Sequence, residues 1–212
     1  DKFMESIHID YNEENCKSYG NNYKPIGLLQ EYGEQRTIDF GLMSGSFVRN
    51  KTGGVLRKNV GVITDEVNVD NGTFTVGNNE KTQGIISFFD ALSIVGYNYK
   101  SGATRYNDSD SCPWGLSSFE NGSCTSWGNP QSEIYLESLR YLAGLPRAQE
   151  GDSKNYVLDN KKIPGLIEAS WVKPIGQKNY CAPVNILQFN ASTSSYDTDE
   201  LSDVSALSFS GD

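Results

Sequence analysis

Histidine is almost absent from this chain. A single histidine, His8, occurs among 212 residues, so a zinc site built from several histidines is excluded. His8 lies in the alternating stretch Phe3–Ile9, which predicts a half-buried strand in which the histidine is structural. The chain also lacks a GxSxG elbow and a Walker-type phosphate loop. The common sequence signatures of acyl transfer and nucleotide binding are therefore missing.

Positive charge and long apolar runs are also scarce. Eighteen Lys and Arg residues face 27 Asp and Glu residues, which gives a formal net charge of -9 at pH 7. The basic residues are scattered, so we expect no nucleic-acid partner. No apolar run approaches the roughly 20 residues that a membrane span needs. The length predicts one domain, or one domain fragment, over residues 1–212.

The four cysteines contain no CxxC pair, which disfavours zinc ribbons and thioredoxin-like motifs. Their even number favours disulfides and an oxidising compartment, with four reduced thiols as the alternative. Cys112 and Cys124 bracket a short loop rich in Gly, Ser and Asn, whose closure would contribute about 3 kcal/mol. By elimination Cys16 would pair with Cys181, although four cysteines allow three connectivities.

Alternating helix and strand signals predict an α/β domain. Residues 48–128 are predicted to be an insertion that is β-rich or irregular and disulfide-stapled. Turn residues at Asp70–Gly72 predict a hairpin. Helices are expected from Pro25 to Gly33, from Ile85 to about Gly96 and from Asn129 to Gly144, and buried strands over 39–47 and 184–189. In the third helix Asn129 would be the N-cap, and Ile134, Tyr135, Leu139 and Leu142 would face inward. Residues 147–162 would form an acidic, lysine-bearing loop.

Three aromatic side chains of the insertion are candidates for recognition. Tyr106, Trp114 and Trp127 could stack on sugars or contact a partner surface, while packing around the disulfide is the alternative.

Acidic residues near the C-terminus are candidates for holding a cation. Asp197, Asp199 and Asp203 are spaced for a hard cation such as calcium, although the twelve-residue calcium loop is not reproduced. The alternative is a solvated acidic tail. We expect no other cofactor.

Six short motifs occur in a characteristic order. They are NYKPIGLLQEY (22–32), FGLMSGSF (40–47), GGVLRKN (53–59), WGNP (127–130), RYLAG (140–144) and YCAP (180–183). Their order and spacing resemble the type IV pilus tip-associated adhesins, the PilY/PilC family, along most of the chain. The resemblance implies an exported protein at a pilus tip or bacterial cell surface, which passes through the periplasm. Its implied partners are other pilus proteins and a host or abiotic surface.

The resemblance also implies a fold, namely part of the family's N-terminal, von Willebrand A-like region. Residues 40–46 would be an inner strand, 129–144 a surface helix and 184–189 a later parallel strand. The metal site of such a domain needs a DxSxS loop, which these 212 residues lack. No export signal precedes Asp1 and the family's usual propeller is missing, so we expect a segment of a longer protein.

The leading interpretation is a non-enzymatic extracellular adhesion module that also supports pilus assembly. One alternative is a secreted polysaccharide-active or hydrolytic domain with paired carboxylates, drawn from Asp65, Glu66 and Asp90. Spacing singles out no acid and base, and adjacent residues of a strand point apart. A second alternative is a purely structural pilus-assembly domain.

Overall fold

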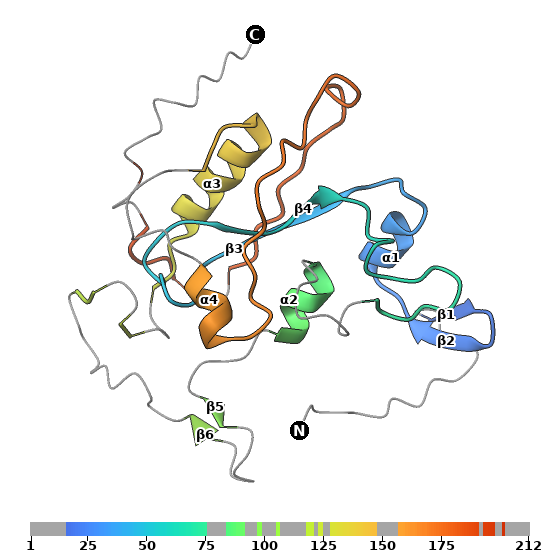
Figure 1. Cartoon of the computed structure of the whole chain (residues 1–212), viewed down its shortest axis with the longest axis horizontal. Helices are drawn as coiled ribbons and strands as arrows, with labels where there is room; N and C mark the ends of the chain where they lie inside the picture. The colour runs from blue at the N-terminus through green and yellow to red at the C-terminus, as the bar shows by residue number, and fades with distance from the viewer. Residues whose placement is uncertain are drawn as a thin grey trace.

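The computed structural model mixes short strands and helices (Figure 1). It describes residues 16–75, 84–91, 97–98, 105–106, 118–120, 123–124, 128–147, 157–190, 193–197 and 201. In chain order the elements are β1 (Cys16–Tyr19), β2 (Asn22–Pro25), α1 (Leu28–Gly33), β3 (Phe40–Ser44), β4 (Val55–Gly61), α2 (Ile85–Ala91), β5 (Tyr97–Asn98), β6 (Arg105–Tyr106), α3 (Gln131–Ala143) and α4 (Val157–Lys162).

The strands form three antiparallel pairs, β1 with β2, β3 with β4, and β5 with β6. The β3–β4 ribbon crosses the middle of the described structure (Figure 1). A later segment runs beside β4, where the Ala169 amide donates to the Leu56 carbonyl at 2.7 Å. Asn59 extends this contact, since its side chain donates to the Ser170 carbonyl at 2.8 Å and accepts from the Val172 amide at 2.9 Å.

The core lies on both faces of this ribbon, because successive side chains of a strand point to opposite sides. On one face Leu56 packs with Tyr141 of α3 and with Ala169. On the other face Phe40 and Leu42 pack against a cluster of Ile63, Val67 and Ile85. Burial on both faces explains why β4 is buried from Val55 to Lys58.

The predicted turn at residues 70–72 is present. Val67 and Phe74 form an antiparallel bridge, and Gly72 has a φ of +67°. A Cβ at Gly72 would lie 2.7 Å from the ring of Tyr19. Glycine is therefore required at this position for its backbone conformation and for the approach to β1.

The predicted helix near residues 129–144 is confirmed, but part of its predicted inward face is wrong. Gly144 ends α3 in a left-handed conformation with a φ of 71°, as predicted. Tyr135 was expected inside and is exposed, whereas Glu133 and Glu137 are buried. The reason is tertiary, since the helix packs on glycines just before β4 and a Cβ at Gly54 would lie 3.1 Å from that of Glu137.

The buried strand predicted over 184–189 is wrong. These residues form no strand and are all exposed. Two helical boundaries also differ: α1 begins at Leu28, since Pro25 ends β2, and α4 lies in a stretch predicted to be a loop. Among the described residues, no helix is long and apolar enough to cross a membrane.

Candidate functional site

A buried ion pair joins β4 to α4. Arg57 and Asp159 are 2 % and 0 % exposed, and the Arg57 Nη2 to Asp159 Oδ2 distance is 2.6 Å. The guanidinium makes four further hydrogen bonds, to Ser44 Oγ and to the carbonyls of Gly45, Leu166 and Ile167. These bonds use all five N–H donors of the arginine.

The second carboxylate oxygen of Asp159 holds the loop that follows β3. Asp159 Oδ1 accepts from Ser46 Oγ at 2.8 Å and from the amides of Phe47 and Val48 at 3.0 and 2.8 Å. Both charged groups are therefore saturated by fixed protein contacts. This arrangement has no open position for a reacting group, and it locks β3, β4, α4 and the 166–167 segment together.

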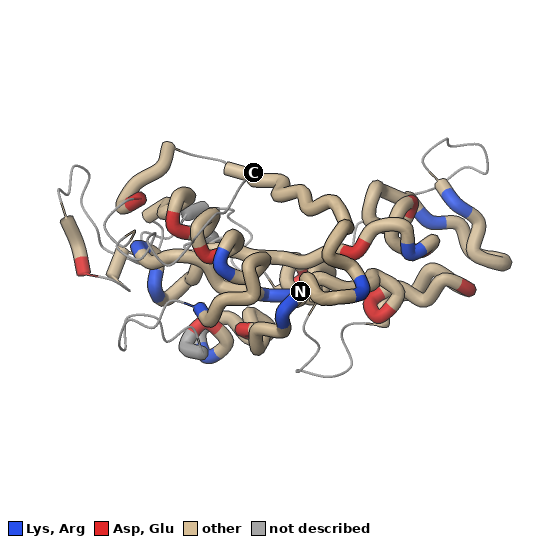
Figure 2. Tube along the Cα trace, turned by 90° about the horizontal axis from the view of Figure 1, so that it is seen from above, with Lys and Arg blue, Asp and Glu red and all other residues tan. Residues whose placement is uncertain are grey.

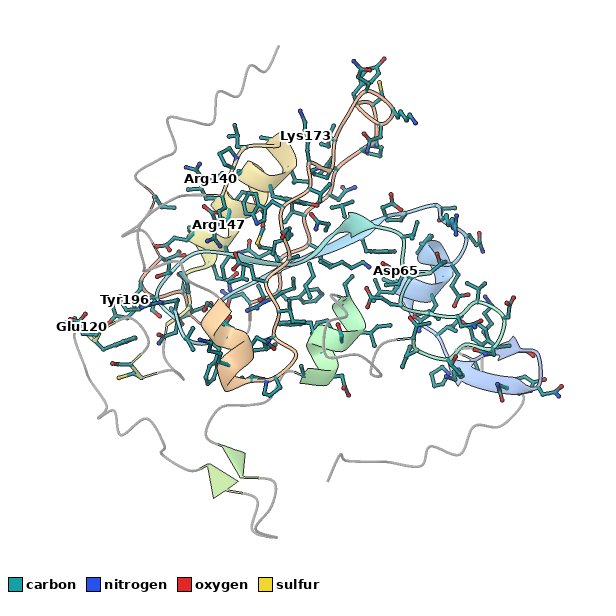
Figure 3. The ribbon with its side chains drawn as sticks, viewed as in Figure 1. Asp65, Glu120, Arg140, Arg147, Lys173 and Tyr196 are labelled. Carbon is teal, nitrogen blue, oxygen red and sulfur yellow. The ribbon has the colours of Figure 1, made fainter. Side chains whose placement is uncertain are left out.

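The carboxylates proposed for hydrolysis have structural partners. Lys58 Nζ lies 2.8 Å from one oxygen of Asp65 and 2.8 Å from Glu66 Oε1. Burial lowers the pKa of Lys58, but hydrogen bonds and charge from the two carboxylates outweigh it and raise the pKa above its ordinary value. Asp65 lies at the edge of this cluster (Figure 3), with its side chain 55 % exposed.

Glu66 also caps the N-terminus of α2. Its carboxylate accepts from the amides of Ile85 at 3.0 Å and Ile86 at 2.8 Å. A Cβ at Gly84 would lie 2.5 Å from Glu66 Oε2, so the glycine makes room for the cap. Glu66 is 1 % exposed, which leaves no access for a substrate. Asp90, the third candidate carboxylate, is exposed in the last turn of α2.

The cysteines differ from the prediction in one pairing. No disulfide joins Cys16 in β1 to the exposed Cys181, so the structure contradicts this predicted pairing. The physical reason is placement, because Cys181 lies on an exposed loop that projects away from β1 (Figure 1). Cys124 is buried and disulfide-bonded. Its predicted partner Cys112 lies outside the described residues, and that pairing stays a prediction.

Residues far apart in sequence meet near Cys124, in a cluster that we call the junction: Asn50, Lys51, Phe119, Cys124 and Tyr196. The Asn50 side chain donates to the Cys124 carbonyl at 2.9 Å. Lys51 Nζ donates to the Phe119 carbonyl at 3.0 Å and lies 4.6 Å from the centroid of the Tyr196 ring. The rings of Phe119 and Tyr196 pack edge to face at 4.8 Å. Figure 3 shows Tyr196 beside Glu120 at one side of the molecule.

Asp197 was predicted as a cation ligand and instead contacts the first turn of α3. Its carboxylate accepts from the backbone amide and, at 2.9 Å, from the hydroxyl of Ser132, and this is the position of a helix cap. Asn129, the predicted cap, pairs instead with Ser195 through two backbone hydrogen bonds of 3.1 Å. Tertiary contacts thus replace the local cap.

The remaining candidates are not brought together. The described part of the chain holds no group of three His, Cys, Asp or Glu residues that could bind a metal ion. Asp199, Asp203, Trp114, Trp127 and the side chain of Tyr106 lie outside the described residues, so the calcium and aromatic sites stay predictions. The insertion boundaries at 48 and 128 also stay a prediction, although β4 within that range supplies part of the core.

Sequence reasoning missed the Arg57–Asp159 pair. The available signal was an arginine and a lysine directly after Val55 and Leu56 in a strand-forming stretch, since charges in a buried strand need partners. Acidic and basic residues are interspersed along the described chain (Figure 2).

Glu168 is one further half-buried acid. Burial raises the pKa of Glu168, and its ion pair with Arg147 opposes that shift.

Comparison with known proteins gives two matches. The sequence model of a family described as "PilY1 homolog, second domain" matches residues 40–212. The "Type IV pilus biogenesis factor PilY1 homolog" of Xylella fastidiosa strain Temecula1 is 32% identical over 220 residues. That alignment covers 97% of this chain and 14% of the relative. No solved structure matches the chain.

Proposed function

The chain belongs to the PilY1 family, and from this premise we propose that it is a non-enzymatic recognition module of a type IV pilus tip protein. The observation that carries the proposal is the similarity over 97% of the chain to a protein named as a pilus biogenesis factor. The chain spans only 14% of that relative, so the pilus role of the whole protein is part of the proposal. Its proposed location is the pilus tip or bacterial surface, after export through the periplasm.

The structural use of the candidate acids supports a non-catalytic role. A glycosidase needs two carboxylates that face a common cleft across the scissile bond. Glu66 instead caps α2 and pairs with Lys58, and Asp65 holds the same lysine. Neither acid is placed to transfer a proton to a substrate, so of the three carboxylates named for the hydrolase alternative only Asp90 is left.

We place the recognition surface in the predicted insertion, on Tyr106, Trp114 and Trp127. Support comes from the junction, where Asn50 and Lys51 bind backbone carbonyls of the segments at 119 and 123–124. These contacts anchor chain that flanks the aromatic residues in sequence. An anchored loop binds with a smaller entropic cost than a mobile one, which favours recognition by this part of the chain.

The test is to replace Trp114 and Trp127 together by alanine in the chromosomal gene of the source bacterium. We expect surface adhesion to fall several-fold while the amount of sheared surface pili stays unchanged, because the aromatic rings act in binding. The matched control replaces the exposed Phe89 by alanine, which should leave both measurements unchanged.

The same experiment separates adhesion from a purely structural role in assembly. Equal loss of pili and of adhesion in the tryptophan variant would favour the assembly role, provided that the protein is exported in normal amounts. Unchanged adhesion would contradict the proposed surface.

We also propose that this segment belongs to a von Willebrand A-like region of the longer protein. Support comes from the resemblance of residues 40–46 and 129–144 to an inner strand and a surface helix of such a domain. Because β3 pairs antiparallel with β4, the parallel strands of that fold have to come from other parts of the polypeptide. A crystal structure of the full-length protein would test this. A sheet in which β3 has only antiparallel neighbours and lies at the edge would contradict the proposal.

A further inference from the structure

Residues 172–190, which we call the arm, leave the body of the protein beside β4 and project outward as a loop (Figure 1). Lys173 marks its base (Figure 3). All residues from 176 to 190 are exposed. The exposed large apolar side chains of the arm are Val172, Tyr180, Val184, Ile186, Leu187 and Phe189, and the last two are 78% and 83% exposed.

The tip of the arm is nevertheless ordered. The Asn179 amide donates to the Gly176 carbonyl at 3.1 Å, and the Ala182 amide donates to the Asn179 carbonyl at 2.9 Å. The Asn179 side chain accepts from the Gly176 amide at 2.7 Å and donates to the Pro174 carbonyl at 2.8 Å. The apolar residues are therefore presented by a defined turn.

The second half of the arm, residues 183–190, has the sequence and the backbone environment of a strand that lacks a neighbouring strand. Residues 183–189 form no helix, and within the described chain their backbone makes no backbone hydrogen bond. Two side-chain hydrogen bonds join this half to the body: Gln188 donates to Gln131 at 2.6 Å, and Asn190 at its end accepts from Asn129 at 2.8 Å. Val, Ile and Phe are strand-forming residues, and an apolar extended segment with open backbone groups pairs readily with another sheet edge.

We propose that the arm docks by strand addition onto an open, acidic sheet edge in another domain of the same polypeptide. The relative matches 97% of this chain within 14% of its own length, so most of such a polypeptide lies outside the described structure. A tethered domain meets the arm at millimolar effective concentration. Main-chain pairing would then supply affinity, and the apolar side chains, with residues 184 and 186 on one face of the strand and residues 187 and 189 on the other, would supply specificity.

Charge determines the kind of edge. The arm carries two lysines, Lys173 and Lys178, and no acidic residue. Its net charge of +2 contrasts with the formal charge of -9 for the chain, which favours an acidic partner edge. A second copy of the chain is a poorer occupant, because without a tether it meets the arm only at its bulk concentration.

The test is amide hydrogen exchange of the arm in two proteins, the 212-residue chain and the full-length protein. We expect peptides that cover 183–190 to exchange roughly tenfold or more slowly in the full-length protein, because strand pairing protects amides. Fast exchange in both proteins would overturn the proposal. Protection that depends on protein concentration would also overturn it, since a second copy would then be the partner.

A double variant, Leu187→Asp with Phe189→Asp, tests the apolar contact within the full-length protein. We expect it to restore fast exchange of 183–190 while peptides from β4 stay protected, because both side chains are exposed in the chain itself. The matched control is Leu28→Asp, at an apolar residue of α1 that is 68% exposed, which should leave the arm protected. Continued protection of 183–190 in the double variant would contradict docking through these residues. The result is independent of adhesion, so its failure leaves the proposed function untouched.

Discussion

Replacement of Asp159 by asparagine tests the buried ion pair that joins β4 to α4. Asn is nearly the same size as Asp, so the change alters charge and hydrogen bonding rather than packing. Asp159 Oδ1 faces three donors, from Ser46, Phe47 and Val48, and Oδ2 faces Arg57. The single amide oxygen of an asparagine can accept hydrogen bonds from only one of these two sets of donors. Its NH2 group would then face the N–H or O–H donors of the other set.

The expected loss of stability follows from burial. Arg57 is 2 % exposed, so the substitution removes the counterion to which its charge is hydrogen-bonded inside the protein. Breaking a buried pair by removing one partner costs about 3–5 kcal/mol. An independent lower bound comes from one unsatisfied buried donor, which costs about 1–3 kcal/mol.

The assay is urea unfolding of the 212-residue chain, followed by far-UV circular dichroism. The matched control is Asp65→Asn, which makes the same chemical change in the ion pair with Lys58. The Asp65 side chain is 55 % exposed. Lys58 keeps Glu66 as a partner there, and we expect a loss below about 1 kcal/mol. A loss for Asp159→Asn no larger than that of the control would refute the reasoning.

Replacing both members by apolar residues separates charge from hydrogen bonding. The variant Arg57→Met with Asp159→Leu removes the buried charge, and such replacements are often neutral when no other group depended on the pair. Here the Phe47 and Val48 amides lose their acceptor. We therefore expect the double variant to recover part of the stability lost in Asp159→Asn, and full recovery would show that these amides contribute little.

Three further predictions concern single residues. Gly128→Ala should lower the free energy of unfolding in urea by about 1–3 kcal/mol or more. Gly128 has a φ of +96°, and an added Cβ would lie 2.2 Å from the Asn50 carbonyl oxygen. The control is Gly45→Ala, which should be tolerated because its Cβ would lie 3.6 Å from the nearest atom. Asp197→Ala should destabilise α3 by about 0.5–2 kcal/mol, whereas Asp197→Asn should keep most of the cap; equal losses in thermal unfolding would contradict capping. Burial raises the pKa of Glu168 above its ordinary value of 4.5, so the folded protein holds the Glu168 proton more tightly than the unfolded chain does. The stabilisation that this proton provides is complete below pH 4.5 and is lost as the pH rises through the folded-state pKa. In the wild-type protein the urea midpoint should therefore fall as the pH rises above 4.5, and Glu168→Gln should make this fall smaller. The same pH dependence in both proteins would contradict the prediction.

Local patterns predicted those features whose causes are local. The turn at Gly72 and the end of α3 at Gly144 both need a positive φ, which only glycine adopts at little cost. The strand 40–44 and the helix 85–91 were also predicted, because apolar residues recur there with the period of the element. The family could likewise be suspected from ordered short motifs.

Features that depend on partners distant in the chain were not predicted. Asp159 lies in an acidic stretch with no apolar period, and its role exists only because folding brings Arg57 to it from 102 positions away. The cap of α3 comes from Asp197, 65 positions after Ser132. Residues 184–189 have the composition of a buried strand and are exposed, since composition cannot say whether a neighbouring strand is present.

Scarce histidine, scarce positive charge and the lack of long apolar runs were properties of the sequence by itself, and they predicted a protein without a histidine-rich metal site, a nucleic-acid partner or a membrane span. The chemical role of each acidic residue was decided only by tertiary structure. Glu66 is a helix cap, Asp159 is a buried counterion and Asp197 caps α3. A carboxylate has the same chemistry wherever it occurs in a chain, and its function is set by the donors and charges that folding places around it.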